Sequence, residues 1–269
     1  VQSGSTYVDS TNYLQTNPWI GQFNDSVGSG WFQGYMQGMR IVKGSGVSST
    51  FTPPTAPQTP TAATTLLVNG MNAGIYDATA INDMDTAGNA QVTTAVSKYG
   101  GSSLRMLTAS DYVKGPLNPL MAFGTGDFTI EAWVYSVAAT SLYTCIFTTR
   151  DGTTSQANCV FFGLKPNTNQ LTFYTSSEII GTTTAVTTGV WTHVALVRSS
   201  GTTVIYINGV NSGSATFTTS LNGQGVAIGN EYNGASGNGG LYVDDLRITK
   251  GYARYTTNFT PPDKAFPTY

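Results

Sequence analysis

The sequence has little charge and almost no cysteine or histidine. Of its 269 residues only 10% are charged, the net charge is −2, and there are two cysteines and one histidine. This composition lacks the clustered Lys and Arg that neutralise phosphates, so we expect no nucleic-acid partner. No apolar run reaches the roughly 20 residues of a membrane-spanning helix and no signal peptide is visible, so we expect no membrane insertion.

The two cysteines, Cys145 and Cys159, are placed symmetrically about Gly152. If residues 143–149 and 158–164 form a hairpin, the two thiols would face each other across it. Cross-strand geometry permits a disulfide only at some ladder positions, so a bridge and two free thiols both remain open.

A sustained helical period is also missing, and alternation of apolar and polar residues takes its place. In residues 128–135 the apolar residues Phe128, Ile130, Ala132 and Val134 alternate with a second, partly aromatic face, and residues 190–198 and 203–208 form two more expected strands. Asn208-Gly209 follows with the positive φ angles of a tight hairpin. Further strands are expected at residues 171–175, 225–228 and 241–248. Many short strands with Gly, Asn and Ser turns indicate an all-β antiparallel sandwich or jelly roll.

The chain contains an internal repeat. Residues 35–54 and 242–262 align, with Tyr-x-x-x-x-Arg-Ile-x-Lys-Gly followed by Phe-Thr-Pro-Pro in both copies. Repeats a domain apart indicate tandem units. We therefore interpret residues 1–50 as the C-terminal remnant of a preceding unit, 51–65 as a Pro/Thr-rich linker, and 66–269 as a complete unit. The remnant is either part of a longer tandem array or completed by another chain.

Five stretches together resemble the concanavalin-like, laminin-G type jelly roll, in the version seen in bacteriophage and cyanophage structural proteins. They lie in the family's order, at residues 100–104 (GGSSL), 123–134 (FGTGDFTIEAWV), 191–198 (WTHVALVR), 206–210 (YINGV) and 243–255 (VDDLRITKGYARY). The resemblance implies a concanavalin-like sandwich over residues 66–269.

The same resemblance implies a function. It predicts a non-enzymatic structural protein at the virion surface, as a tail-fibre or capsid-decoration component. Its expected partners are other virion proteins, copies of itself in a homo-oligomer, and host-surface polysaccharide. The alternative is a carbohydrate-binding or adhesion module of a secreted bacterial protein.

Asp244 is the candidate metal ligand. On a regular strand it shares a face with Leu246 and Ile248, so a core-facing pair would turn its carboxylate inward. A buried carboxylate must meet a cation, an Arg or several N–H donors. Calcium is the answer that the resemblance implies, and hard carboxylate oxygens suit it. The candidate co-ligands are Asp77, Asp83 and Asp85.

Catalysis has little support in the sequence. Glycoside hydrolysis needs two carboxylates beside a cleft, but the alternate neighbours of Glu131 are Thr129 and Trp133. His193 is the only histidine and has no nucleophile motif to serve. We therefore expect no enzymatic activity.

Glycan binding needs aromatic rings beside amide and hydroxyl groups. Tyr232, Asn233 and Tyr174 are the candidate glycan-binding residues, and Tyr143 and Trp31 can add to such a platform. Aromatic side chains serve equally well in cores and interfaces, so the sequence alone does not separate these roles for the tyrosines and Trp31.

Overall fold

The computed structural model describes residues 22–25, 28–31, 39–44, 51–53, 55, 64–68, 84–152, 154–232 and 239–267. The chain divides into two compact units, Val1–Asn72 and Ala73–Tyr269. In the described residues the only helices are two short 3-10 turns, η1 (Pro119–Met121) and η2 (Gln156–Asn158). No helix in these parts of the chain is long and apolar enough to cross a membrane.

The described residues of the first unit form two antiparallel strand pairs. Strand β1 (Gln22–Asp25) pairs with β2 (Gly28–Trp31), and β3 (Met39–Val42) pairs with β4 (Thr64–Val68). The sequence prediction began the jelly roll at residue 66, whereas β4 belongs to the first unit, which extends to Asn72. The interpretation of the early residues as a domain remnant stays a prediction.

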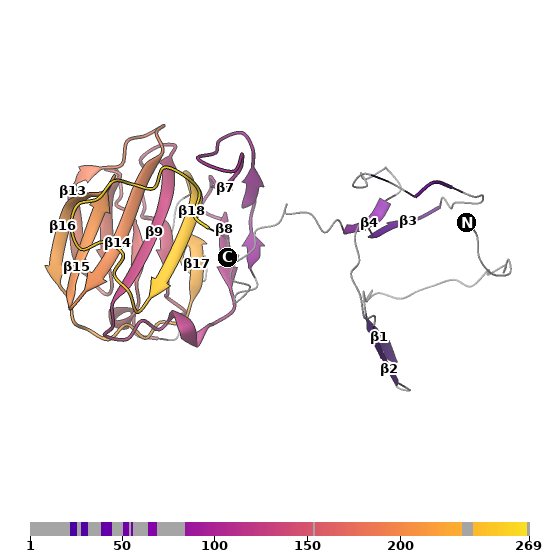
Figure 1. The fold of residues 1–269 in the computed structure, drawn as a ribbon, viewed down its shortest axis with the longest axis horizontal. Coiled ribbons are helices and arrows are strands. Elements are labelled where there is room, and N and C mark those ends of the chain that lie inside the picture. The colour runs from indigo at the N-terminus through magenta and orange to yellow at the C-terminus, as the bar shows by residue number, and fades with distance from the viewer. Residues whose placement is uncertain are drawn as a thin grey trace. The chain divides into compact units, whose positions relative to one another are not determined.

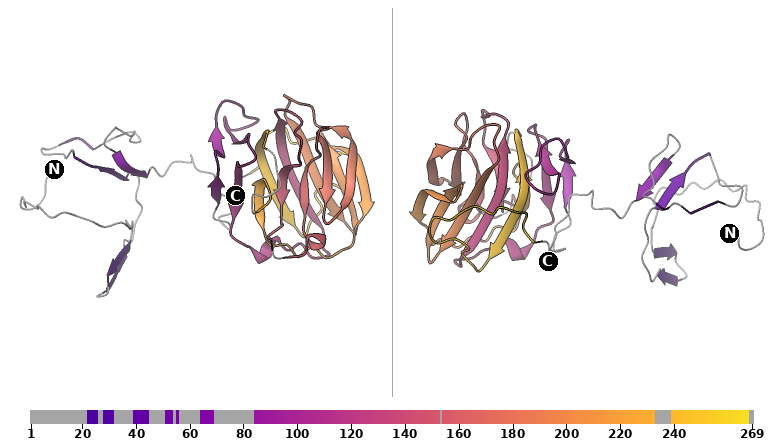
Figure 2. Two further views of the ribbon diagram at one scale, coloured as in Figure 1. Left: turned by 180° about the vertical axis from the view of Figure 1, so that it is seen from behind. Right: turned by 45° about the horizontal axis from the view of Figure 1, so that its top comes forward.

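The second unit is a sandwich of two seven-stranded sheets, which confirms the predicted fold class (Figure 1). The front sheet, which faces the viewer of Figure 1, has the order β16-β15-β14-β9-β18-β7-β6. The back sheet has the order β13-β12-β11-β10-β17-β8-β5, and Figure 2 shows it from behind. All described pairings within the two sheets are antiparallel.

The front sheet is built from β6 (Gln91–Thr93), β7 (Ser103–Met106), β9 (Phe128–Ser136), β14 (Thr192–Ser199), β15 (Thr202–Ile207), β16 (Val210–Thr216) and β18 (Leu241–Lys250). The back sheet is built from β5 (Asp85–Ala87), β8 (Tyr112–Gly115), β10 (Thr144–Thr148), β11 (Phe161–Leu164), β12 (Gln170–Tyr174), β13 (Glu178–Ala185) and β17 (Val226–Gly229). The strands expected from alternation are all present within one or two residues of their predicted ends.

Alternation along each strand supplies the core between the sheets. In β9, Phe128, Ile130, Ala132 and Val134 are buried in the core cluster, and the alternate residues Thr129, Glu131 and Trp133 face outward. Burying a side chain such as Ile130 stabilises the fold by roughly 1.5–3 kcal/mol. The predicted tight hairpin between β15 and β16 is confirmed, because Asn208 and Gly209 have φ angles of 48° and 77°.

A β-bulge in β18 overturns the predicted direction of Asp244. The register with β9 shifts between Asp244 and Arg247, and Asp245 takes a positive φ of 48°. Val243 faces the core before the bulge, and Leu246 packs against the same core after it. Asp244 therefore lies opposite Trp133 on the outer face. The parity argument was wrong because it assumed an unbroken strand, and a bulge adds one residue to the alternation.

The segment that follows β18, residues 251–267, crosses the outer face of the front sheet and is called the strap below (Figure 1). The Phe259 N–H donates to the Gly209 carbonyl (2.9 Å), and the Tyr99 hydroxyl donates to the Pro262 carbonyl (2.8 Å). The rings of Tyr255 and Phe259 stack at 3.5 Å. These bonds fix the strap along its length, so the outer face beneath it is a second, smaller buried layer.

Candidate functional site

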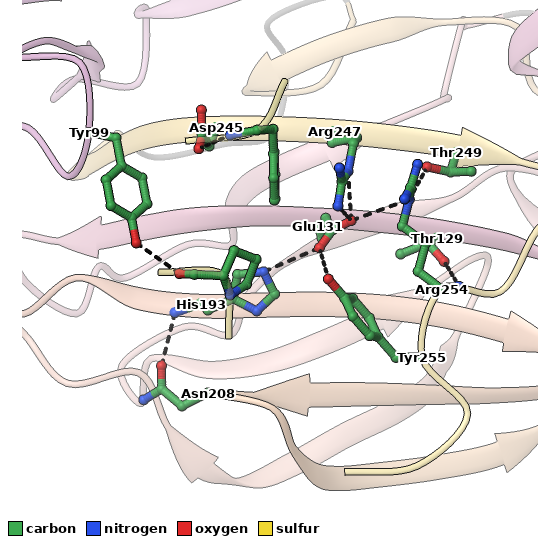
Figure 3. Close-up of polar contacts among 12 residues, drawn as sticks. Tyr99, Thr129, Glu131, His193, Asn208, Asp245, Arg247, Thr249, Arg254 and Tyr255 are labelled. Atoms are coloured by element: carbon green, nitrogen blue, oxygen red, sulfur yellow. Dashed lines mark hydrogen bonds and ion pairs between the residues drawn. The ribbon is translucent and has the colours of Figure 1, made fainter. Parts of the chain in front are cut away.

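Glu131 lies at the centre of the layer under the strap (Figure 3). One carboxylate oxygen is 2.9 Å from Nε and 2.8 Å from Nη2 of Arg247. The other accepts a hydrogen bond from the Tyr255 hydroxyl (2.8 Å) and lies 3.3 Å from Nε2 of His193. The side chains of Glu131 and His193 are both fully buried.

The network keeps Glu131 ionised. Burial alone would raise the pKa of its carboxyl, but His193, the Tyr255 hydroxyl and the Arg247 charge outweigh burial and leave the pKa below its ordinary value. Burial, with the neighbouring carboxylate, raises the pKa of Tyr255. A general acid must exchange protons with a substrate that can reach it. The Glu131 carboxylate is enclosed and paired, so it is suited instead to holding the strap in place.

Asp244 has its lone pairs directed at backbone donors. One oxygen accepts from the N–H groups of Lys98 (2.9 Å) and Tyr99 (3.0 Å), and the other accepts from the N–H of Asp245 (2.9 Å). This is the hydrogen-bonded alternative for Asp244, in which three N–H donors stabilise the carboxylate.

The other predicted calcium ligands do not join Asp244 in the described residues. Asp85 lies on β5 of the back sheet, opposite Lys114, whereas Asp244 is in the front sheet. Asp77 and Asp83 lie outside the described residues. Across the described residues no group of three or more His, Cys, Asp or Glu side chains is arranged to hold a metal ion.

A row of small residues crosses the outer face of the back sheet. Cys145 lies opposite both Gly229 and Gly163, Gly163 lies opposite Thr172, and Thr172 lies opposite Gly181. Without large side chains in this row, rings from the neighbouring positions can lie down on the sheet. A Cβ at Gly163, for example, would come within 2.8 Å of the Phe161 ring.

Aromatic rings gather over this row. Tyr143 is 5.8 Å from both Phe161 and Tyr174, measured between ring centroids. The Arg150 guanidinium carbon lies 5.3 Å from the Phe161 ring and 5.5 Å from the Tyr174 ring. Phe161 is buried beneath the group, whereas Tyr143 and Tyr174 are partly exposed. The arrangement is therefore a surface with a buried aromatic base and two accessible tyrosines.

A charged pair completes the surface. Arg150 forms an ion pair with Glu231 and donates to the Thr175 carbonyl. Their side chains are 11% and 15% exposed. Within the described part of the chain, Arg150 Nε has no hydrogen-bond partner. Tyr143, Arg150, Phe161, Tyr174 and Glu231 are called the Arg150 patch below.

The Arg150 patch has the chemistry of a polar ligand site. Binding sites for small polar molecules combine apolar or aromatic surface with a few placed donors and acceptors. Here the tyrosine rings supply the surface, Arg150 supplies planar donors, and Glu231 supplies acceptors.

The sequence found part of this patch. Of the predicted glycan-binding residues, Tyr174 belongs to it, as does Tyr143. Tyr232 adjoins Glu231, and its ring lies 5.4 Å from Lys114 Nζ. Asn233 lies outside the described residues, as does the side chain of Trp31. Arg150 and Glu231 were missed, because they are 81 positions apart in the sequence and come together only in the folded domain.

The cysteines are two free, buried thiols. The expected hairpin of β10 and β11 exists, but Cys145 pairs with Gly163, and Cys159 precedes β11, 3.4 Å from the Ser155 carbonyl. The two thiols therefore do not face each other. Burial raises the pKa of both, that of Cys159 to about 11.

Solved structures with a similar fold share little sequence with the chain. One is the binding domain of Paraclostridial Mosquitocidal Protein 1, with a TM-score of 0.49 and 14% identity over 65% of this chain and 45% of that one. Another is Domain 4 of AbnA, a GH43 extracellular arabinanase from Geobacillus stearothermophilus, in complex with arabinotriose. Its TM-score is 0.46, with 19% identity over 64% of this chain and 83% of that one. The chain thus spans less than half the length of the mosquitocidal binding domain.

No curated protein sequence matches the chain. The model of the Laminin_G_3 family, described as the concanavalin A-like lectin/glucanases superfamily, matches residues 107–253. The matched residues include β8 to β18, and with them the Arg150 patch, Glu131, His193 and Arg247, but not Tyr255. Because this match extends over more than half of the chain, the chain belongs to the concanavalin A-like lectin/glucanases superfamily.

Proposed function

We propose that the chain is a non-enzymatic glycan-binding module of a virion structural protein, a tail-fibre or capsid-decoration component that attaches to host-surface polysaccharide. The observation that carries the binding function is the Arg150 patch, where two partly exposed tyrosines flank a charged donor and acceptor. Membership of a lectin-type superfamily supports the same function.

The patch suits a neutral sugar. The flat C–H face of a sugar ring can lie against Tyr143 or Tyr174, and adjacent hydroxyls can donate to Glu231 and accept from Arg150. Because Arg150 and Glu231 compensate each other's charge, the surface offers no net attraction for an anionic ligand. Hydrogen bonds to charged partners contribute about 1.5–3 kcal/mol each, enough for selectivity among hydroxyl arrangements.

The absence of catalysis is part of the proposal. Glu131, on the face opposite the patch, is fully buried, paired with Arg247 and covered by the strap. A hydrolytic mechanism would need a second carboxylate about 5–10 Å away beside a reachable glycosidic bond. Conversion of Glu131 to Gln is therefore expected to change stability and to leave any glycan substrate uncleaved.

The location on a virion rests on the sequence resemblance and on the low-charge, hydroxyl-rich composition. Multiple copies on one particle would raise avidity without new contacts. Peptide mapping of purified virions tests this part, and absence of the chain from the particle would overturn it. The alternative, a module of a secreted bacterial protein, would then stand with the binding function unchanged.

Glycan binding is tested with the full chain on an array of neutral oligosaccharides and polysaccharides. We expect Tyr174→Ala and Arg150→Gln to weaken binding to any recognised glycan by tenfold or more. Tyr252→Ala is the matched control, because Tyr252 is a 62% exposed tyrosine on the strap. A chain that binds no neutral glycan, or whose binding is equally affected by all three changes, would refute the function at this patch.

A further inference from the structure

A second aromatic surface lies on the outer face of the front sheet. Tyr135 of β9 is directly opposite Tyr242 of β18, and Trp191 immediately precedes β14 on the other side of β9. The ring centroids of Tyr135 and Trp191 are 5.6 Å apart, and those of Tyr135 and Tyr242 are 5.7 Å apart. These three residues, called the aromatic row below, thus span three adjacent strands.

The aromatic row is accessible. All three residues are partly exposed. Val190, next to Trp191, is 52% exposed, and Val137, two residues after Tyr135, is 43% exposed. In the described residues the strap makes no hydrogen bond or ring contact with the row. The strap is bonded instead near Trp133, two residues before Tyr135 on β9. There the ring of Tyr99 packs on Trp133, and the Tyr99 hydroxyl donates to the Pro262 carbonyl of the strap.

A cation extends the row by one strand. Arg105 of β7 lies directly opposite Tyr242, with Gln91 of β6 beyond it. The neighbours of Arg105 along β7, Leu104 and Met106, face the core, so its side chain shares the outer face with the rings.

Arg105 is not neutralised within the molecule. Its Nη1 donates a long hydrogen bond of 3.5 Å to the Asn89 carbonyl, and among the described residues no carboxylate pairs with it. Arg150, on the opposite face of the sandwich, is in contrast paired with Glu231. The two surfaces share an aromatic base and differ in the charge that they offer a ligand.

We propose that the aromatic row and Arg105 form a second binding site, for a saccharide that carries a carboxylate. The three rings receive the apolar faces of consecutive sugar units, and the guanidinium pairs with the carboxylate in the planar geometry that Arg favours. Charge complementarity selects this ligand class, because the site has a free cation and the Arg150 patch does not. The site lies on another sheet, and its existence does not depend on the proposed function.

The test measures binding of the full chain to polygalacturonate, alginate and polysialic acid at about 0.15 M salt, where long-range attraction between exposed charges is screened. Polygalacturonate with its carboxylates reduced to alcohols is the uncharged counterpart. The variants are Arg105→Gln and Tyr135→Ala. Lys264→Gln removes an exposed cation from the strap as the matched control, and Arg150→Gln reports on the other face. Thermal unfolding verifies that each variant is folded.

We expect at least one acidic polymer to bind, with a tenfold or greater loss in Arg105→Gln and Tyr135→Ala and none in Lys264→Gln or Arg150→Gln. Binding of reduced polygalacturonate that is lost only in Arg150→Gln belongs to the neutral-glycan site on the other sheet, whereas binding that is lost in Tyr135→Ala would remove the role of the carboxylate and overturn the proposal. So would absence of binding to all three acidic polymers, or an equal loss in Lys264→Gln. Failure of neutral-glycan binding with this result intact would refute only the function proposed for the Arg150 patch.

Discussion

Arg247 holds Glu131 with two of its nitrogens and at the same time lies against the strap. Its Nε and Nη2 are 2.9 Å and 2.8 Å from one oxygen of Glu131, and its guanidinium carbon is 3.7 Å from the centroid of the Phe266 ring. The ion pair therefore connects β9, β18 and the strap.

Replacing Glu131 by Gln is expected to destabilise the fold by about 3–5 kcal/mol, because it leaves the Arg247 charge without its buried partner. The free energy of unfolding from urea titration measures the loss. Glu178→Gln is the control, since Glu178 pairs with Lys165 at an exposed site, where about 0–1 kcal/mol is expected. Equal losses in the two variants would contradict the structural role of Glu131.

The same carboxylate gives the fold a defined acid sensitivity. The groups around it are His193, Tyr255, Arg247 and Arg254. Because its pKa is lowered in the folded state, its stabilising effect is complete above the unfolded pKa of about 4.3. The effect is lost as the pH falls through the lower folded value. As the pH falls below about 4.3, the urea midpoint of the wild type should fall more steeply than that of Glu131→Gln. Parallel curves for the two proteins would contradict the assignment of this acid sensitivity to Glu131.

Gly209 is expected to tolerate no side chain. Its φ is 77°, and a Cβ there would overlap the carbonyl oxygen of Phe259 in the strap. Gly251 is the matched control, because its φ is 82° and nothing lies within 4 Å of its would-be Cβ. Both Ala variants share a backbone strain of roughly 1–2 kcal/mol. Only Gly209→Ala should also make the strap more susceptible to limited proteolysis; equal cleavage of both would argue against this contact.

Cys145 and Cys159 should resist thiol reagents in the folded protein. Both side chains are fully buried, and burial raises the pKa of each thiol, which suppresses the reactive thiolate. We expect a colourimetric thiol titration to detect neither in native buffer and both in denaturant. Reductant should leave the melting temperature unchanged, and a lower value on reduction would indicate a disulfide.

Much of the fold was predictable because alternation is a local signal. The strict period of β9 and the Asn208-Gly209 turn follow from residues adjacent in sequence, and the structure has both where they were expected. The bulge at Asp245 was not predictable from alternation. Strands are predicted from alternation by assuming a constant period of two residues. The positive φ of Asp245 is a backbone conformation, and the order of apolar and polar residues does not reveal it.

The Arg150 patch was only partly predictable for a different reason. Tyr143 and Tyr174 were candidates by residue type, but Arg150, which follows β10, and Glu231, which follows β17, are 81 positions apart and meet only in the folded domain. The row of small residues beneath the rings is equally non-local, since it takes one residue from each of five strands. Such sites depend on register, which a single sequence does not specify.

The bulge in β18 also determines how this strand should be aligned with relatives. Tyr242 of the aromatic row and Arg247 of the Glu131 network lie on the same face, although one has an even and the other an odd number, because the register shifts between Asp244 and Arg247. A relative with an unbroken strand would present the same two surfaces with one residue fewer. The gap in that alignment belongs at Asp245, and placing it elsewhere would put core residues in the columns of surface residues.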